Sequence, residues 1–197
     1  MAPSGSVVIA VHYQNEVLHP DGQIRVGVAA DSPARAGLID AAARLLTGAR
    51  AKGVPVVSVR IAFRPDHADV ITNCRLFRDV AASGAMSDGS WGAEFFADLG
   101  PLPGEFVVSH SRNNPFYGSP LEQVLERLQA KHLIFAGIAT NYAVEHGVRH
   151  AADIGFEVTI ARDACSAAEP DLHEASLRTL SRLATIGLVD DIINGFR

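Results

Sequence analysis

Short apolar runs rich in β-branched residues alternate with longer helical patterns along most of this 197-residue chain. Several of the runs are almost continuously apolar, which is typical of strands that are covered on both faces of a parallel sheet. The stronger runs span residues 6–13, 55–63, 105–110, 132–138 and 156–164, and a weaker one spans 184–190. This alternation constrains the fold more than any other feature of the sequence.

The segments between the apolar runs predict helices. In the segment 32–53, Ser32 is a candidate N-cap, Pro33 takes the first helical position and Gly53 ends the pattern. Further helical patterns cover residues 119–131, 140–155 and 169–184. The sequence therefore predicts an α/β fold: a single domain over residues 1–197, with an open, doubly wound parallel sheet of about six strands and helices on both faces.

Residues 64–104 break the alternation, because they are rich in Gly, Pro, Asp and Ser. A long irregular insertion in a compact fold is usually functional, so this one is interpreted as a lid or an interface. Its aromatic residues Trp91, Phe95 and Phe96 are candidates for packing there. If they close over a pocket, they would exclude water from it.

Composition excludes several classes of function. The formal net charge of −5 argues against nucleic-acid binding, which needs a basic surface. No apolar run approaches the length of a membrane span, and no targeting segment is visible. Cys74 and Cys165 are too few for a disulfide framework or a zinc-thiolate site. We therefore expect a cytoplasmic protein that acts on a small molecule and binds neither nucleic acid nor membrane.

Polar side chains follow several of the predicted strands. His12 and Gln14 follow the first, Arg60 lies at the end of the second, and His110 and Arg112 at the end of the third. Thr140 and Asn141 follow the fourth strand. Because ligands of open α/β sheets bind beyond the carboxyl ends of the strands, these residues are candidates for one site.

Four segments carry a resemblance to a known family. They read "VVIAVHYQNEVLHP", "PVVSVRIAFRPDH", "EFVVSHSRNNPFYGSPLEQVLERL" and "HLIFAGIATNYAVEHGVRHAADIGFEVTIARDACSA". Together they resemble the isochorismatase-like hydrolase superfamily over nearly the whole chain. The resemblance implies a triad of Asp, Lys and Cys, and its alignment places His12, His110 and Ala143 at these three positions. The chain is thus a divergent member that lacks the triad.

Ala143 cannot form the thioester that amidases of the superfamily make, because nucleophilic catalysis needs an activatable side chain. Isochorismatases proper are a second template, since some protonate a vinyl ether without a cysteine, but they keep the Asp and the Lys. We therefore expect a hydrolase that acts on a small polar or anionic metabolite by general acid–base catalysis. His12 and His110 would be its catalytic pair and would share one positive charge.

The resemblance also implies a cis peptide at Ile138–Ala139, which would direct the amides of Ala139 and Ala143 into the pocket as an oxyanion hole. Arg60 and Arg112 are candidates to pair a substrate carboxylate, with an ion pair to a neighbouring acid as the alternative. The full set of expected substrate-binding residues is Gln14, Arg60, Arg112, Phe116, Thr140, Asn141 and Tyr142.

Other interpretations stay open at this point. The same pocket suits a proton-shuttling isomerase, lyase or cyclase, and also a catalytically inactive ligand-binding homologue. No cofactor or metal is expected, although His146 and His150 share a helix face and are an alternative metal site. Cys165 is interpreted as a small buried residue. The resemblance implies a homodimer or homotetramer.

Overall fold

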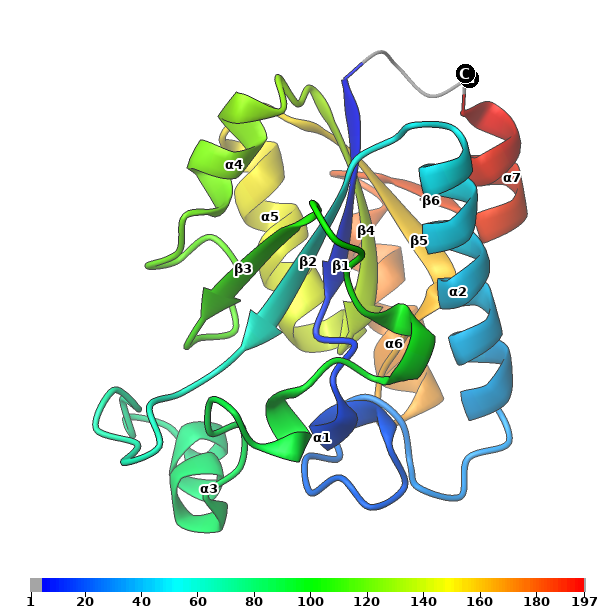
Figure 1. Cartoon of the computed structure of the whole chain (residues 1–197). Coiled ribbons are helices and arrows are strands. Elements are labelled where there is room, and N and C mark those ends of the chain that lie inside the picture. Colours follow the sequence, from blue (N-terminus) through cyan, green and yellow to red (C-terminus); the bar gives the residue numbers. More distant parts are fainter. Residues whose placement is uncertain (1–4, 197) are drawn as a thin grey trace.

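A computed structural model of the chain describes residues 5–196 and shows a single six-stranded sheet with helices on both faces (Figure 1). All neighbouring strands pair in parallel, in the order β3-β2-β1-β4-β5-β6. This confirms the predicted α/β class. The strands are β1 (Ser6–Val11), β2 (Val56–Ile61), β3 (Phe106–His110), β4 (His132–Ile138), β5 (Glu157–Ser166) and β6 (Thr185–Gly187).

The helices divide between the two faces of the sheet. α2 and α7 pack on one face, and α4, α5 and α6 contribute to the apolar core on the other (Figure 1). A π-helical turn over Thr140–Val144 leads directly into α5. The helices are α1 (Asn15–Leu18), α2 (Arg35–Ala51), α3 (Arg75–Ser83), α4 (Leu121–Arg127), α5 (Glu145–Asp153), α6 (Pro170–Leu180) and α7 (Val189–Gly195).

The central strand β1 shows why its sequence is continuously apolar. Every residue of the strand is buried. Val8 and Ala10 pack into the core under α2, whereas Val7 and Ile9 pack into the core under α4 and α5. Successive side chains of a strand point to opposite faces, so a strand with a core on both sides needs apolar residues at every position.

The chain order of the strands sets the position of the site. The chain builds outward from β1 through β2 to β3, and then returns to place β4 on the other side of β1. The carboxyl ends of β1 and β4 therefore meet at the topological switch point, where open α/β sheets bind ligands. Gly137 is required there, because a Cβ atom on it would lie 2.2 Å from the carbonyl oxygen of Val11.

The structure corrects three expectations about the elements. The segment 64–104 is not wholly irregular, since it contains α3 and two short 3₁₀ helices, Trp91–Ala93 and Ala97–Leu99. The weak strand at 184–190 shortens to β6 and is followed by α7. Ser32 does not cap α2, which begins at Arg35; its hydroxyl instead accepts a hydrogen bond from the amide of Ala34.

Within residues 5–196, no helix combines the length and apolar character that a bilayer crossing needs.

Candidate active site

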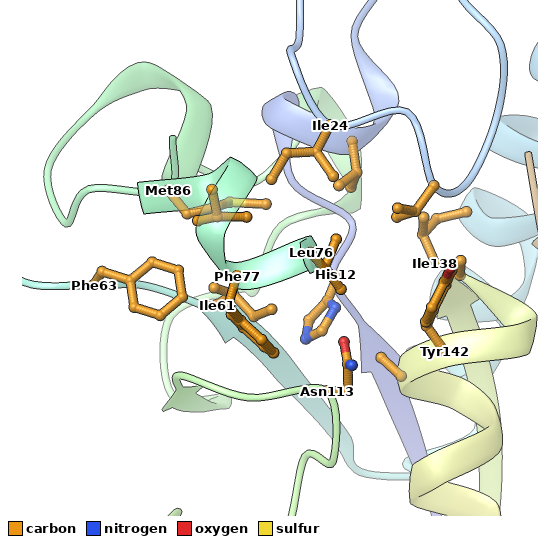
Figure 2. A pocket seen from close by; sticks show the side chains of 15 residues that line it. His12, Ile24, Ile61, Phe63, Leu76, Phe77, Met86, Asn113, Ile138 and Tyr142 are labelled. Atoms are coloured by element: carbon orange, nitrogen blue, oxygen red, sulfur yellow. The ribbon is translucent and has the colours of Figure 1, made fainter. Parts of the chain in front are cut away.

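His12 follows the last residue of β1 and turns the chain out of the sheet. Its backbone is left-handed, with φ 55°, a conformation in which histidine is enriched among non-glycine residues. Its amide donates to the carbonyl of Val59, and its own carbonyl accepts from the amide of Gln14. These two bonds hold the turn, and the His12 side chain lines a cavity at the switch point (Figure 2).

His110 reaches the same place from the edge strand β3. Its Nε2 lies 2.6 Å from Nε2 of His12, and the two rings stack with centroids 4.8 Å apart and an interplanar angle of 26°. Both side chains are almost fully buried. The structure thus brings together the two histidines that the alignment placed at the aspartate and lysine positions.

The hydrogen-bond partners of His12 and His110 limit which ring nitrogens can carry a hydrogen. Nδ1 of His110 lies 3.2 Å from the carbonyl oxygen of Asn114, so this nitrogen carries a hydrogen and donates it. In the neutral imidazole, Nε2 of His110 is then an acceptor, and Nε2 of His12 must donate to it. In this arrangement Nδ1 of His12 has a lone pair and no hydrogen. In the reverse arrangement the His12 ring donates to the backbone of Ile138, a bond that raises its pKa, and Nε2 of His110 donates to Nε2 of His12.

Burial lowers the pKa of both rings. The pKa of His12 lies well below 6.5, chiefly because burial disfavours the charged form and secondly because of repulsion from His110; a hydrogen bond with the backbone of Ile138 opposes these effects. Burial lowers the pKa of His110 to about 4, against a raising contribution from its bond to Asn114. Both shifts favour an uncharged pair near neutral pH, and one positive charge shared by the pair stays a prediction.

The lowered pKa of His110 predicts a loss of stability in mild acid. The unfolded chain takes up a proton at this residue below pH 6.5, whereas the folded chain resists it down to about pH 4. The free energy of unfolding should therefore fall as the pH drops through this range, by about 3 kcal/mol for a shift of this size. Urea denaturation at pH 7.5 and pH 4.5 measures the difference.

The control for this prediction is His110→Gln, which removes the titrating ring. Carboxylates of the protein contribute to acid sensitivity in both proteins, so only the difference between them reports on His110. We expect the variant to lose clearly less stability between the two pH values than the parent. An equal loss in both proteins would show that His110 titrates normally.

The cavity beside His12 is small and mainly apolar. Its volume is about 40 Å³, which accommodates only a few water-sized groups. Polar side chains reach it from His12, Asn113 and Tyr142 (Figure 2). The remaining lining residues are Val17, Ile24, Val26, Ile61, Phe63, Leu76, Phe77, Val80, Met86, Ile138, Ala139 and Ala143.

Part of the insertion 64–104 covers this cavity. Leu76, Phe77 and Val80 of α3 line it on one side, and Met86 follows from the same segment (Figure 2). The aromatic residues expected there lie elsewhere. Trp91, for example, packs edge-on against His19, with 5.0 Å between the ring centroids. Phe95 and Phe96 are also absent from the cavity lining.

Three residues expected from the strand-end turn do line the cavity, namely Ala139, Tyr142 and Ala143. The Ile138–Ala139 peptide is cis, as the resemblance implied. Ala143 is buried beside His12 and has no reactive group, so the nucleophile position is occupied by a methyl group.

Gln14, Thr140 and Phe116 lie outside the cavity lining, contrary to the expectation that they bind substrate. The Gln14 amide is fully buried and pairs with the backbone of Ile61 and Ala93. The Thr140 hydroxyl lies 2.8 Å from Nδ1 of His173. Phe116 stacks on His150, with 4.5 Å between the ring centroids. These side chains hold the scaffold around the site.

Arg60 and Asn141 are likewise outside the cavity lining. Arg60 pairs with Asp88 at 2.9 Å, which is the ion-pair alternative left open above. Oδ1 of Asn141 is buried without a hydrogen-bond partner. Arg112 is also outside the cavity lining, and its guanidinium stacks 3.9 Å from the ring centroid of Phe77, which lines the cavity.

Among residues 5–196 there is no cluster of three or more His, Cys, Asp or Glu side chains that could hold a metal. His146 and His150 share α5, but their Nδ1 atoms have separate partners, the carbonyl of Tyr142 and the amide of Asn114. Cys165 is buried, and burial raises the pKa of its thiol to about 12, so it is no nucleophile at neutral pH.

Comparison with known proteins now becomes informative. The isochorismatase domain matches residues 6–191. The chain belongs to the isochorismatase family. The isochorismatase family protein YecD of Escherichia coli O157:H7 is 30% identical over 158 residues, covering 80% of this chain and 82% of YecD. The ureidoacrylate amidohydrolase RutB of Methylobacterium radiotolerans is 28% identical, covering 96% of this chain and 78% of RutB.

Solved structures of isochorismatase-family proteins show the same fold. The cysteine hydrolase from Pseudomonas syringae pv. phaseolicola has a TM-score of 0.87 at 22% identity, and the match covers 98% of this chain and 93% of the hydrolase. The isochorismatase family protein from Desulfovibrio vulgaris has a TM-score of 0.84 at 24% identity, with 96% and 98% covered. The family is one of hydrolases, and this member has Ala143 where the alignment expects the cysteine.

Proposed function

We propose that this isochorismatase-family protein is a cysteine-independent hydrolase of a small metabolite, with His12 as its general base. The observation that supports this most is the buried contact between the Nε2 atoms of His12 and His110. The proposal takes the arrangement in which Nε2 of His12 donates to His110, so that the lone pair of His12 lies on Nδ1. A base with a lowered pKa is unprotonated, and therefore ready to act, at neutral pH.

In the proposed reaction, Nδ1 of His12 takes a proton from a water molecule in the cavity as the water oxygen bonds to an electrophilic carbon of the substrate. The amides of Ala139 and Ala143 would stabilise the negative oxygen that develops. The bond to the leaving group then breaks, and the His12 imidazolium returns its proton to that group. His110 accepts a hydrogen bond from His12 throughout and holds the His12 ring in place, which makes it a positioning residue.

In this proposal Ala143 stands at the nucleophile position and has no thiol with which to form a thioester. Ureidoacrylate, the substrate named for the amidohydrolase relatives, is therefore expected to remain unhydrolysed. Substrates whose cleavage needs only an activated water, such as small esters, remain compatible with the site.

A second candidate function is a proton-shuttling isomerase or lyase. The apolar lining and the small volume of the cavity favour it, because such a site limits access of water. In this reaction Nδ1 of His12 would remove a proton from a carbon beside a carbonyl group and return it at another position. No water molecule is consumed.

Incubation of a panel of small esters, vinyl ethers and 2-oxo acids in oxygen-18 water, with mass spectrometry of the products, separates the two candidates. We expect label from water in the product of the best substrate. Turnover without the oxygen label, but with deuterium incorporated from D₂O, would replace hydrolysis by the proton shuttle. Binding without any turnover would contradict both and leave a ligand-binding homologue.

A further inference from the structure

A polar groove adjoins the apolar cavity. Its volume is about 360 Å³, and Asn113 lines both the groove and the cavity. The Asn113 side chain lies close to His12 at the rim of the cavity (Figure 2). The groove is otherwise lined by Ile71, Asn73, Arg112, Asn114, Tyr117 and His146. A molecule that passes Asn113 would therefore have one part among apolar side chains and the other among polar ones.

Arg112 supplies the positive charge of this groove. Its guanidinium donates to the carbonyl of Ile71 and to Oδ1 of Asn73, both of which are uncharged. No ion pair joins it to a carboxylate within the described part of the chain, whereas Arg60 and Arg64 pair with aspartates. The stack on Phe77 holds the guanidinium in place and leaves some of its five N–H donors for a ligand.

His146 adds a second polar atom to the groove. Its Nδ1 lies 2.8 Å from the carbonyl oxygen of Tyr142, so this nitrogen carries the hydrogen of the neutral ring. Nε2 then has a lone pair, so the neutral ring offers the groove an acceptor and not a donor. Arg112 and His146 thus belong to one groove although they come from the segment after β3 and from α5.

We propose that the substrate is a short-chain monocarboxylate, with its apolar reacting end in the cavity beside His12 and its carboxylate in the groove on Arg112. The proposal rests on the proposed function in taking the cavity as the place of reaction. The opposite orientation would bury a carboxylate among apolar side chains without a charged partner, which is strongly unfavourable. Arginine, by contrast, binds carboxylates through paired N–H donors.

Butanoate and butanamide are suitable probes, because they share shape and apolar chain and differ in charge. Their binding to the intact protein is measured by NMR titration at pH 7.5 in moderate salt. We expect butanoate to bind about tenfold more tightly than butanamide, since a hydrogen bond to a charged group is stronger than one to a neutral group. Arg112→Gln should remove this preference, and Arg112→Lys should keep most of it.

The matched control is Arg75→Gln. Arg75 lies in α3, exposed and near Asp79, so the substitution removes one arginine charge without changing the groove lining. It should leave the preference for butanoate unchanged. Equal binding of the two probes to the parent, loss of the preference in Arg75→Gln, or no binding of either probe would overturn the proposal.

The preference for butanoate and the catalytic role of His12 can be tested separately. His12→Gln should retain the preference for butanoate, because Arg112 and the groove are unchanged, even where turnover is lost. If the preference holds and turnover does not depend on His12, the carboxylate site stands and the catalytic proposal fails. If turnover depends on His12 but the preference is absent, the substrate class alone is wrong.

Discussion

Replacement of His12 by glutamine is expected to lower kcat by about 100- to 10,000-fold, the range that a lost general base costs. Glutamine has a similar reach but no basic nitrogen. The substitution therefore removes the proton acceptor that the proposed reaction places at Nδ1 of His12. His12 lines the cavity and His110 does not, so the fall in kcat should be larger for a substitution at His12. Steady-state kinetics on the best substrate of the panel measures this loss.

His19→Gln is the matched control, because His19 is partly exposed and pairs with Asp21 at the surface. It should keep the activity of the parent within about twofold, as surface substitutions usually have small effects. Activity retained in a folded His12→Gln protein would remove His12 from the mechanism. Circular dichroism and a thermal melt would establish that the variant is folded.

His110→Gln tests the positioning role. In the proposed arrangement the ring of His110 accepts the hydrogen bond from Nε2 of His12. Electrostatic repulsion from His110 also helps to keep the pKa of His12 low. A variant without this neighbour should show a smaller fall in kcat and an acid limb of the pH–rate profile that moves to higher pH. An unchanged profile would indicate that His110 only fills space.

Replacement of Gln14 by leucine is expected to destabilise the fold by about 3–6 kcal/mol, because each buried polar group left unpaired costs about 1–3 kcal/mol. Nε2 of Gln14 donates to the carbonyls of Ile61 and Ala93, each at 2.8 Å, and Oε1 accepts from the amide of Ile61 at 2.9 Å. Leucine fills a similar volume but satisfies none of these backbone groups. Urea denaturation at neutral pH measures the loss.

Gln23→Leu is the corresponding control, since Gln23 is exposed and only its backbone amide is bonded, to Glu16. Its effect should stay within about 0.5 kcal/mol, which is usual at the surface. A small effect at Gln14 as well would show that the buried amide network contributes little. In that case the interpretation of Gln14 as a scaffold residue would be wrong.

Most of the sheet could be predicted from the sequence, because strands with a core on both sides must be apolar at every position. Helix α7 could not be predicted in the same way. Its first amide, on Val189, is capped by Oδ1 of Asp163, which comes from β5. A cap supplied by another strand leaves no local signal. Helix α3 was missed because it lies in a segment that is rich in Gly, Pro, Asp and Ser.

Some residues of the candidate site could be predicted from the sequence, and others could not. The alignment of the strand ends identified His12, His110 and Ala143, because each lies at a fixed distance from a recognisable motif. Asn113 had no such signal, yet it lines both the cavity and the groove. Its role depends on how α3 folds back over the switch point.

The order of residues along the chain determined which elements form and which side chains stand at the strand ends, because side-chain periodicity and turn chemistry act over a few residues. The tertiary structure alone decided the charge state and the partners of those side chains. Desolvation of an imidazole and a contact between two rings that are 98 residues apart both depend on atoms from distant segments. Electrostatic interactions act through space, and the sequence does not give those distances.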